Sequence, residues 1–225
     1  MEKLNREENA FIIRSKRIAE VLVHLSNSLA SLLHNVGRDS GANWIYSRIY
    51  PLQKRLAELD PNHNEEILAA VSCGYGRVLR SLLQYEEADA LFAFALNVYI
   101  KKFKFSRNVS DVYRQCMATT CNDMGLLRHD TGAYDEAEEM YHFARKILNN
   151  LSQEYPDTYN FELAEVYENS GLNEFYGRQN PQRAQVLFRA AYQMIADDPR
   201  HRAKADELSR LVGICASRNR THSTE

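Results

Sequence analysis

The stretch HDTGAYDEAEEMYHFARKIL, residues 129–148, decides the fold of this chain. It places a turn glycine, two aromatic rings and two small residues at short, regular steps: Gly132, Tyr134, Ala137, Tyr141 and Ala144. Steps of three and four residues return a side chain to the same face of an α-helix. Small residues on that face let a neighbouring helix come close, and a ring fills the space beside the crossing. The stretch therefore predicts a turn followed by the second helix of a closely packed helical hairpin.

The same pattern occurs in three copies with small departures. Each copy has a glycine on the helix that precedes the turn. We expect that glycine to lie opposite the first alanine of the second helix, so that Gly125 faces Ala137. Because one hairpin cannot bury both of its apolar faces, the copies should stack on one another. The repeat-packing residues are Gly76, Tyr85, Ala88, Phe92 and Ala95 in the first copy, Gly125, Gly132, Tyr134, Ala137, Tyr141 and Ala144 in the second, and Gly171, Ala184, Phe188 and Ala191 in the third.

The motif G-x6-G-x-Y-x2-A-x3-Y-x2-A of residues 125–144 resembles the tetratricopeptide repeat (TPR), and the resemblance covers about residues 64–197. Equivalent alanines lie 49 residues apart from Ala88 to Ala137 and 47 apart from Ala137 to Ala184. The usual repeat has 34 residues, so this is a long variant whose helices are each longer by about one to two turns. The resemblance implies an all-α fold, a right-handed superhelical array of antiparallel helical hairpins (a TPR-like α-solenoid). It also implies protein or peptide binding and no enzymatic activity.

Helical periodicity runs through nearly the whole chain, and no segment persuasively predicts a strand. Short connections, several opened by proline, divide the chain into nine expected helices at about 4–36, 42–59, 64–83, 86–104, 107–130, 134–154, 157–177, 181–197 and 200–216. We expect residues 1–62 to form an N-terminal helical cap or dimerisation segment, and 63–199 to form three TPR-like hairpins. A C-terminal capping helix should follow at 200–216, then a disordered tail at 217–225.

Composition narrows the classes of function. The chain has 28 Lys and Arg against 30 Asp and Glu, a formal net charge of −2, so it has no overall attraction for nucleic acid or an anionic membrane. Its four cysteines lack the spacing of a zinc site, and no motif of a phosphate loop, metalloprotease or serine hydrolase occurs. We therefore expect no metal, no cofactor and no catalytic residue. The first residues do not match a signal peptide, which favours a cytoplasmic location and no membrane.

In tetratricopeptide proteins the first helix of each hairpin lines the concave face, so the resemblance implies that a protein or peptide binds there. The amides of Asn122 and Asn169 can both donate to and accept from a peptide backbone. Family members that hold a C-terminal carboxylate use basic residues across the repeats, whereas this chain has Glu162 and Glu165 in the third copy. The expected concave-face residues are Arg77, Arg80, Gln115, Asn122, Leu126, His129, Glu165 and Asn169.

Two alternatives to a binding scaffold remain open at this stage. One is a peptide-sensing regulatory protein in which a short ligand tightens the superhelix. The other is an RNA-binding helical-repeat protein that uses residues 99–107, YIKKFKFSR, where aromatic residues alternate with Lys101, Lys102, Lys104 and Arg107. Cations at the end of a helix also complement its dipole, and that explanation disfavours nucleic acid as the partner.

The N-terminal segment has an apolar seam with heptad spacing. Apolar residues recur every seven residues from Leu4, with a second set interleaved, and such a seam needs a helical partner. The partner is either the following helix of the same chain, which contains Trp44, Ile45, Ile49 and Leu52, or another copy in a homodimer through residues 4–36. The seam residues are Leu4, Phe11, Ile18, Leu22, Leu25, Leu29, Leu32 and Val36.

Overall fold

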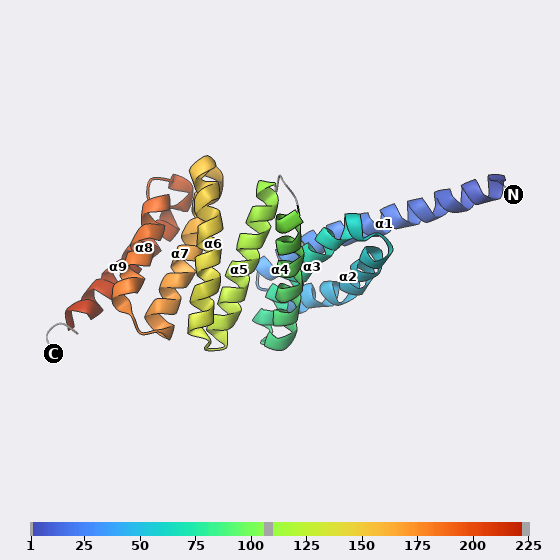
Figure 1. The fold of residues 1–225 in the computed structure, drawn as a ribbon. Coiled ribbons are helices and arrows are strands. Elements are labelled where there is room, and N and C mark those ends of the chain that lie inside the picture. Colours follow the sequence, from blue (N-terminus) through green and yellow to red (C-terminus); the bar gives the residue numbers. More distant parts are fainter. Residues whose placement is uncertain (1, 106–109, 222–225) are drawn as a thin grey trace. The chain divides into compact units, whose positions relative to one another are not determined.

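The computed structural model of the chain consists almost entirely of α-helices (Figure 1). It describes residues 2–105 and 110–221, with side chains from 15–104 and 110–220. No strand occurs in these residues, and the predicted fold class, all-α with successive antiparallel helical hairpins, is confirmed. The elements are α1 (Glu2–Asn35), α2 (Asp39–Leu59), α3 (Pro61–Ser81), α4 (Tyr85–Phe105), α5 (Asp111–Asp130), α6 (Tyr134–Glu154), α7 (Pro156–Leu172), the π-helical turn η1 (Asn173–Gly177), α8 (Pro181–Ile195), the 3-10 turn η2 (Pro199–His201) and α9 (Arg202–Thr221).

The chain divides into two compact units, Met1–Lys102 and Phe103–Glu225, called unit 1 and unit 2. Unit 1 holds α1 to α3 and most of α4, and in unit 2 the helices α5 to α9 lie side by side in chain order (Figure 1). The predicted domain limits, which follow the repeats, stay a prediction. Residues 217–221 of the expected tail belong to α9, and 222–225 lie outside the described residues.

Each first helix of a hairpin is followed by a residue in the left-handed backbone conformation. Glycine adopts this conformation without steric cost, whereas a residue with a Cβ atom is disfavoured by about 1–2 kcal/mol. Leu83 nevertheless adopts it in the first copy of the repeat, at the place that Gly132 takes in the second. The turn geometry is therefore kept where glycine is absent. The four residues and their φ angles are Gly37 (73°), Leu83 (61°), Gly132 (79°) and Gln179 (53°).

The glycines on the first helices make room for aromatic rings of the second helices. A Cβ atom added to Gly125 would lie 2.5 Å from the ring of Tyr141, a side chain with no exposed surface. The three nearest atoms all belong to that ring, as expected for a ring that fills the space beside the crossing. That Gly125 faces Ala137, which is fully buried one turn earlier on α6, stays a prediction. The two other copies repeat the arrangement, with 2.7 Å from Gly76 to the Phe92 ring and 2.6 Å from Gly171 to the Phe188 ring.

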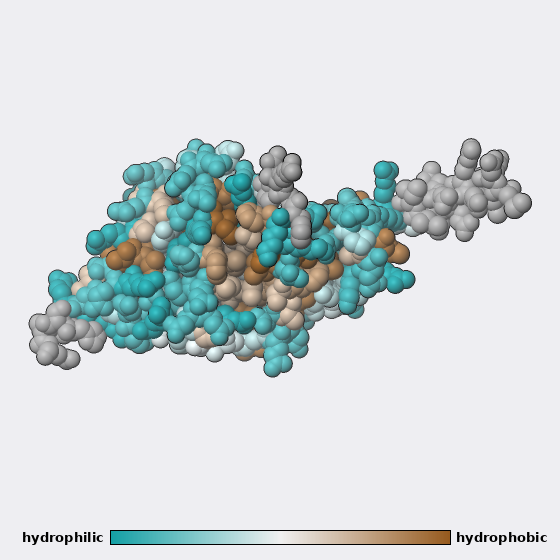
Figure 2. Space-filling view, viewed as in Figure 1, coloured by the Kyte–Doolittle hydropathy of each residue, from teal (hydrophilic) through white to brown (hydrophobic). Residues whose placement is uncertain are grey.

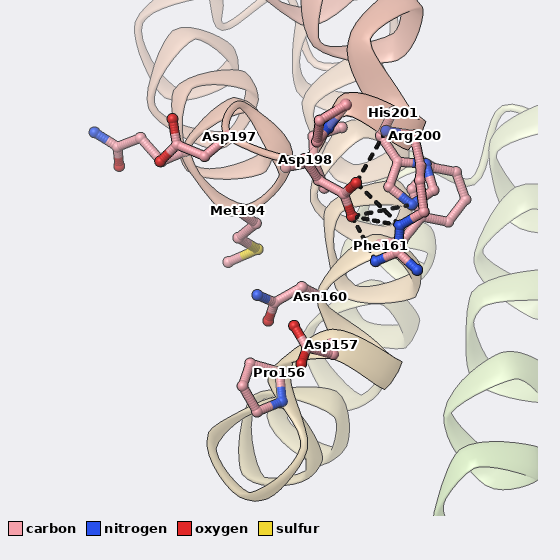
Figure 3. A pocket seen from close by; sticks show the side chains of 12 residues that line it. Pro156, Asp157, Asn160, Phe161, Met194, Asp197, Asp198, Arg200 and His201 are labelled. Carbon is pink, nitrogen blue, oxygen red and sulfur yellow. Dashed lines mark hydrogen bonds and ion pairs between the residues drawn. The ribbon is translucent and has the colours of Figure 1, made fainter.

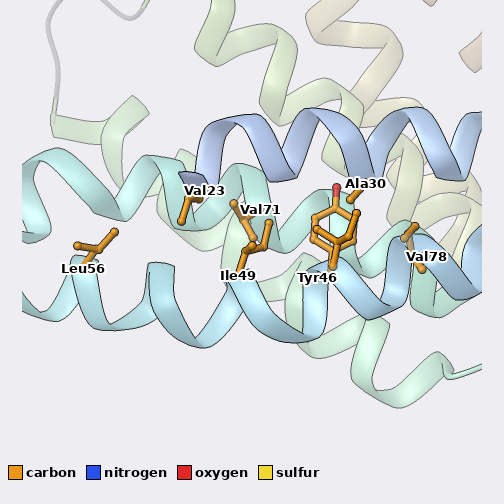
Figure 4. Packing of buried hydrophobic residues seen from close by; sticks show 9 residues of the cluster. Val23, Ala30, Tyr46, Ile49, Leu56, Val71 and Val78 are labelled. Carbon is orange, nitrogen blue, oxygen red and sulfur yellow. The ribbon is translucent and has the colours of Figure 1, made fainter. Parts of the chain in front are cut away.

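The α1–α2 hairpin is a further copy that the sequence analysis missed. Measured from its left-handed turn residue, its buried residues have the same offsets as those of the second copy. Ala30 stands where that copy has Gly125, and Ile49 where it has Ala144, so neither residue signalled the repeat. Figure 4 shows Ala30, Tyr46 and Ile49 together in the core of unit 1. The corresponding exposed fractions are 0% for Ala30, 0% for Ala42, 1% for Tyr46 and 7% for Ile49.

Helix α1 contacts its own unit through a face other than the heptad seam. Val23 and Ala30 are fully buried against α2 and α3, with Ala19 and Leu33 partly buried beside them. The ring of Tyr46 occupies the neighbouring space, and side chains of modest size fit next to it. The expectation that the heptad seam packs on α2 was therefore wrong. Helix α2 is the neighbour of α1, but it contacts the face with Val23 and Ala30. The seam residues are Ile18, Leu22, Leu25, Leu29, Leu32 and Val36, and all are more than half exposed.

Candidate functional site

Polar side chains join α5 to α7, the first helices of two successive hairpins in unit 2. The Nε2 atom of Gln115 donates to Glu162 Oε2 at 2.9 Å, and the hydroxyl of Thr119 donates to Glu162 Oε1 at 2.6 Å. The Nδ2 atom of Asn169 donates to Asn122 Oδ1 at 3.0 Å. All five side chains are half-buried, so each is fixed yet reachable from solvent. We call these five residues the α5–α7 face.

The amide pair at the centre of this face has hydrogen-bonding capacity left over. A side-chain amide carries one acceptor oxygen and a two-donor nitrogen. The bond between the two residues uses the oxygen of Asn122 and one hydrogen of Asn169. The nitrogen of Asn122 and the oxygen of Asn169 thus remain as a donor and an acceptor on adjacent helices. A peptide unit presents the complementary acceptor and donor.

His129 and Leu126 continue the α5 surface toward its C-terminal end. The Nδ1 atom of His129 lies 3.0 Å from Asn173 Oδ1, and Asn173 Nδ2 donates to the backbone oxygen of Tyr134 at 2.9 Å. Because the amide oxygen of Asn173 can only accept, Nδ1 of His129 carries the proton in this arrangement. The imidazole is therefore held in place by a buried amide, while Leu126 is half-buried.

Glu165 brings negative charge to the α7 side of this surface. The residue keeps exposed surface, but the surrounding protein partly encloses its carboxyl, and this loss of solvation is the main cause that raises its pKa. The charge of Lys204 lowers this pKa, and those of Glu162 and Glu168 raise it. Lys204 of α9 donates to Glu168 at 2.8 Å. Lys204 also pairs with Glu207 at 3.3 Å, so one lysine lies among several carboxylates. The region therefore favours a cationic group on a ligand.

Arg77 and Arg80 belong to α3 in unit 1, whereas the other six expected site residues belong to unit 2. Both side chains are half-buried and have interactions of their own. Burial raises the pKa of Tyr46 to about 12, and the positive charge of Arg77 partly opposes this shift. Arg77 therefore lies close to the core ring that Gly74 also approaches. Its assignment to a binding surface stays a prediction.

The sequence analysis missed a buried ionic cluster that joins α6, α7, η1 and α8. Glu138, only 7% exposed, accepts from Arg145 at 2.8 Å and from the hydroxyl of Ser170 at 2.6 Å. Arg183 bridges Glu138 at 3.2 Å and the fully buried Glu174 at 3.1 Å. Glu138 and Arg145 lie on the same helix. Ser170 and Arg183, however, are 32 and 45 residues from Glu138, so no local pattern joins the hairpins. The mutual bonds of these side chains make the cluster a structural connection between hairpins.

A depression with a volume of about 350 Å³ lies between the start of α7 and the α8–α9 joint. Figure 3 shows Asp198 at its rim, bonded to Arg200 and His201. The hydrogen bond from Arg200 is the main cause that lowers the pKa of Asp198 to about 2, and the His201 ring stacks on Phe161 with centroids 4.0 Å apart. Asp198 and Arg200 at the rim thus pair with each other, and this pairing points to no ligand for the cavity.

The basic segment at the end of α4 is partly neutralised. Lys101 pairs with Glu65 at 3.7 Å and Lys102 with Glu66 at 2.5 Å, whereas Lys104 is exposed and Arg107 lies outside the described residues. Two of the four basic residues of this segment thus form ion pairs within the chain. RNA binding by the segment stays a prediction. Over the described residues, no helix has a stretch long and apolar enough to cross a membrane.

Comparison with known structures defines the class: the chain has the fold of TPR-like helical-repeat proteins. It is similar to the crystal structure of BtubC (BKLC) from P. vanneervenii, with 21% identity and a TM-score of 0.60 over 79% of this chain and 65% of that chain. It is also similar to PilF of Pseudomonas aeruginosa, with 17% identity and a TM-score of 0.58 over 91% of this chain and 72% of that chain. No protein-family model and no curated protein sequence matches.

Proposed function

We propose that the protein is a non-enzymatic binding scaffold that holds an extended protein segment or peptide on the α5–α7 face. The Asn122–Asn169 pair is the observation that carries this proposal, since it offers a donor and an acceptor on neighbouring helices. An amide pair can hold a backbone without selecting the side chains of the ligand. Gln115, Leu126 and His129 extend the contact along α5. A cytoplasmic location remains the prediction from the sequence.

The charges beside the face define the preferred ligand. Glu165 is exposed next to Glu162 and Glu168, with Lys204 as the nearby cation. A basic side chain on the ligand would complement this excess of negative charge. A free C-terminal carboxylate would be repelled by it, so we propose an internal segment that contains Lys or Arg.

The test is selection from a displayed library of random twelve-residue peptides on the immobilised full chain. The affinity of a selected peptide is then measured for the wild type and for the Asn122→Ala/Asn169→Ala variant. Two lost hydrogen bonds of about 0.5–1.5 kcal/mol each predict binding weaker by about fivefold or more. The matched control is Asn150→Ala, an exposed asparagine on α6, which should bind like the wild type. Equal affinity of the double variant and the wild type would remove the proposed surface.

A second predicted partner, another copy of the chain bound through residues 4–36, would use a different surface, the exposed face of α1. The regulatory alternative has no separate structural observation in its favour and stays a prediction.

A further inference from the structure

Helix α1, together with Val36 directly after it, exposes a continuous row of large apolar side chains. Their spacing of four, three, four, three and four residues is that of a coiled-coil seam, and the row is on a different face from the buried Val23 and Ala30. Figure 2 shows brown, hydrophobic side chains on part of the surface of unit 1. Exposed fractions are 61% for Ile18, 53% for Leu22, 65% for Leu25, 52% for Leu29, 62% for Leu32 and 70% for Val36.

The seam is almost free of charge. From residue 18 to residue 36 the only Asp, Glu, Lys or Arg is Glu20, which lies on the side of α1 near Lys16 and Asn64. A helix that lies on a membrane surface usually carries Lys and Arg on its polar face, and this segment has none. A partner protein with a charged surface would also find no residue of opposite charge along this seam. An apolar seam of the same kind is the surface that fits best.

Helix α1 is longer than the hairpin that supports it. Its 34 residues span about 51 Å, against about 32 Å for the 21 residues of α2. Lys16 pairs with Asp60 at the α2–α3 joint at 2.6 Å, and α1 continues beyond this point past the ends of α2 and α3 (Figure 1). The heptad spacing of the sequence also continues there, at Leu4 and Phe11. The occupant of the seam should therefore be a long helix, about 33 residues if the seam is used from end to end.

We propose that a second copy of the chain covers this seam, with the two α1 helices antiparallel. In a parallel pair, the seam positions Glu8 and Ser15 would each face their own counterpart, and two carboxylates would meet in an apolar interface. In an antiparallel pair with position 18 opposite position 22, Glu8 instead faces position 32 and Ser15 faces position 25, both leucines. Position 4 then faces position 36, so all ten seam positions from 4 to 36 are paired.

The length of this seam suits a stable dimer. Four of every seven residues in a two-stranded coiled coil contact the partner, which gives about nineteen residues per copy over 33 positions. A standard specific interface uses roughly 20–30 residues on each side. The proposed pairing uses a helix of unit 1, whereas the α5–α7 face belongs to unit 2.

Sedimentation equilibrium of the full chain tests the pairing. The wild type should have about twice the 26.0 kDa mass of one chain, and Leu25→Glu should raise the dissociation constant at least 100-fold by placing a charge in the interface. Leu59→Glu, on α2 and 67% exposed, is the matched control and should stay dimeric. Circular dichroism checks that both variants keep their helices. A monomeric wild type, or a Leu25→Glu variant that is still dimeric, would overturn the proposal.

Disulfide trapping tests the orientation. Chains with Leu4→Cys are mixed with chains that carry Val36→Cys, and the mixture is oxidised beside the wild type with its native cysteines. An antiparallel pair yields the mixed crosslinked dimer and little product from either variant alone. Crosslinking of Val36→Cys to itself would show a parallel pair and would overturn the proposed orientation.

Discussion

The ring of Tyr141 occupies the space that a side chain at Gly125 would need, with 2.5 Å between an added Cβ atom and the nearest ring atom. The same relation joins a glycine to a phenylalanine in the copies before and after it. The repeat is therefore defined by a ring that enters a gap on the facing helix. In the three hairpins that have this glycine, the contact lets the two helices approach closely.

Gly125→Ala should destabilise the protein, because the buried ring cannot move aside. Overpacking costs about 1–3 kcal/mol, and the better helix propensity of alanine returns about 1 kcal/mol of it. We expect a net loss of up to about 2 kcal/mol in the free energy of unfolding by urea. Gly213→Ala in α9 is the matched control: an added Cβ meets nothing within 4 Å, so stability should rise by about 0.5–1 kcal/mol. A gain of similar size at both positions would contradict the packing described.

Glu138→Ala should cost about 3–5 kcal/mol, because it leaves Arg145, 8% exposed, without its carboxylate. Thermal or urea unfolding measures this loss. The neighbouring Glu139 is exposed, so Glu139→Ala should change stability by less than about 0.5 kcal/mol. If the two variants were equally stable, the cluster would contribute nothing to the connection between hairpins.

The stability of the wild type relative to Glu174→Gln should fall as the pH rises above 4.5. Burial raises the pKa of the fully buried Glu174 from 4.5, although Arg178 and Arg183 oppose the shift. The folded chain then holds the proton more tightly than the unfolded chain, so this contribution is present at low pH and is lost as the pH rises through the folded-state pKa. Urea unfolding of both proteins from pH 4 to 7 gives the difference. A difference that stays constant, or grows with pH, would contradict the raised pKa.

Leu83→Gly should stabilise the turn between α3 and α4. Leu83 has a φ of 61° and is 70% exposed, so it bears a strained backbone without burying its side chain. Relief of about 1–2 kcal/mol is partly offset by the greater freedom of glycine in the unfolded chain, which leaves a gain of up to about 1 kcal/mol. The melting temperature measures the gain. A lower melting temperature would show that the leucine side chain contributes packing at this position.

The sequence predicted the hairpins well because their signals are local. Glycine, alanine and an aromatic residue at helical spacing act within one hairpin, so Gly125 and Tyr141 could be recognised without knowledge of the rest of the fold. The copy in α1–α2 escaped because Ala30 replaces the glycine and still leaves enough room. Contacts between hairpins gave no such signal, since Glu138 and Arg183 lie 45 residues apart.

The heptad seam shows the limit of such patterns. Its spacing predicted correctly that α1 presents an apolar row, and the structure shows that this row is exposed from Ile18 to Val36. The spacing could not tell which face of α1 meets α2, because Val23 and Ala30 form a second apolar face on the same helix. Likewise, Asn122 and Asn169 were singled out as separate residues. Their mutual hydrogen bond depends on how α5 and α7 stack, which no local pattern encodes.

The most direct measurement of ligand binding on the α5–α7 face is the nitrogen-15 NMR spectrum of the side-chain amides during titration with a peptide selected on the full chain. The account predicts that the Asn122 and Asn169 amide signals shift in proportion to the bound fraction, while those of Asn150 on α6 stay in place. Binding that moves the Asn150 signals and leaves those of Asn122 and Asn169 unchanged would contradict it.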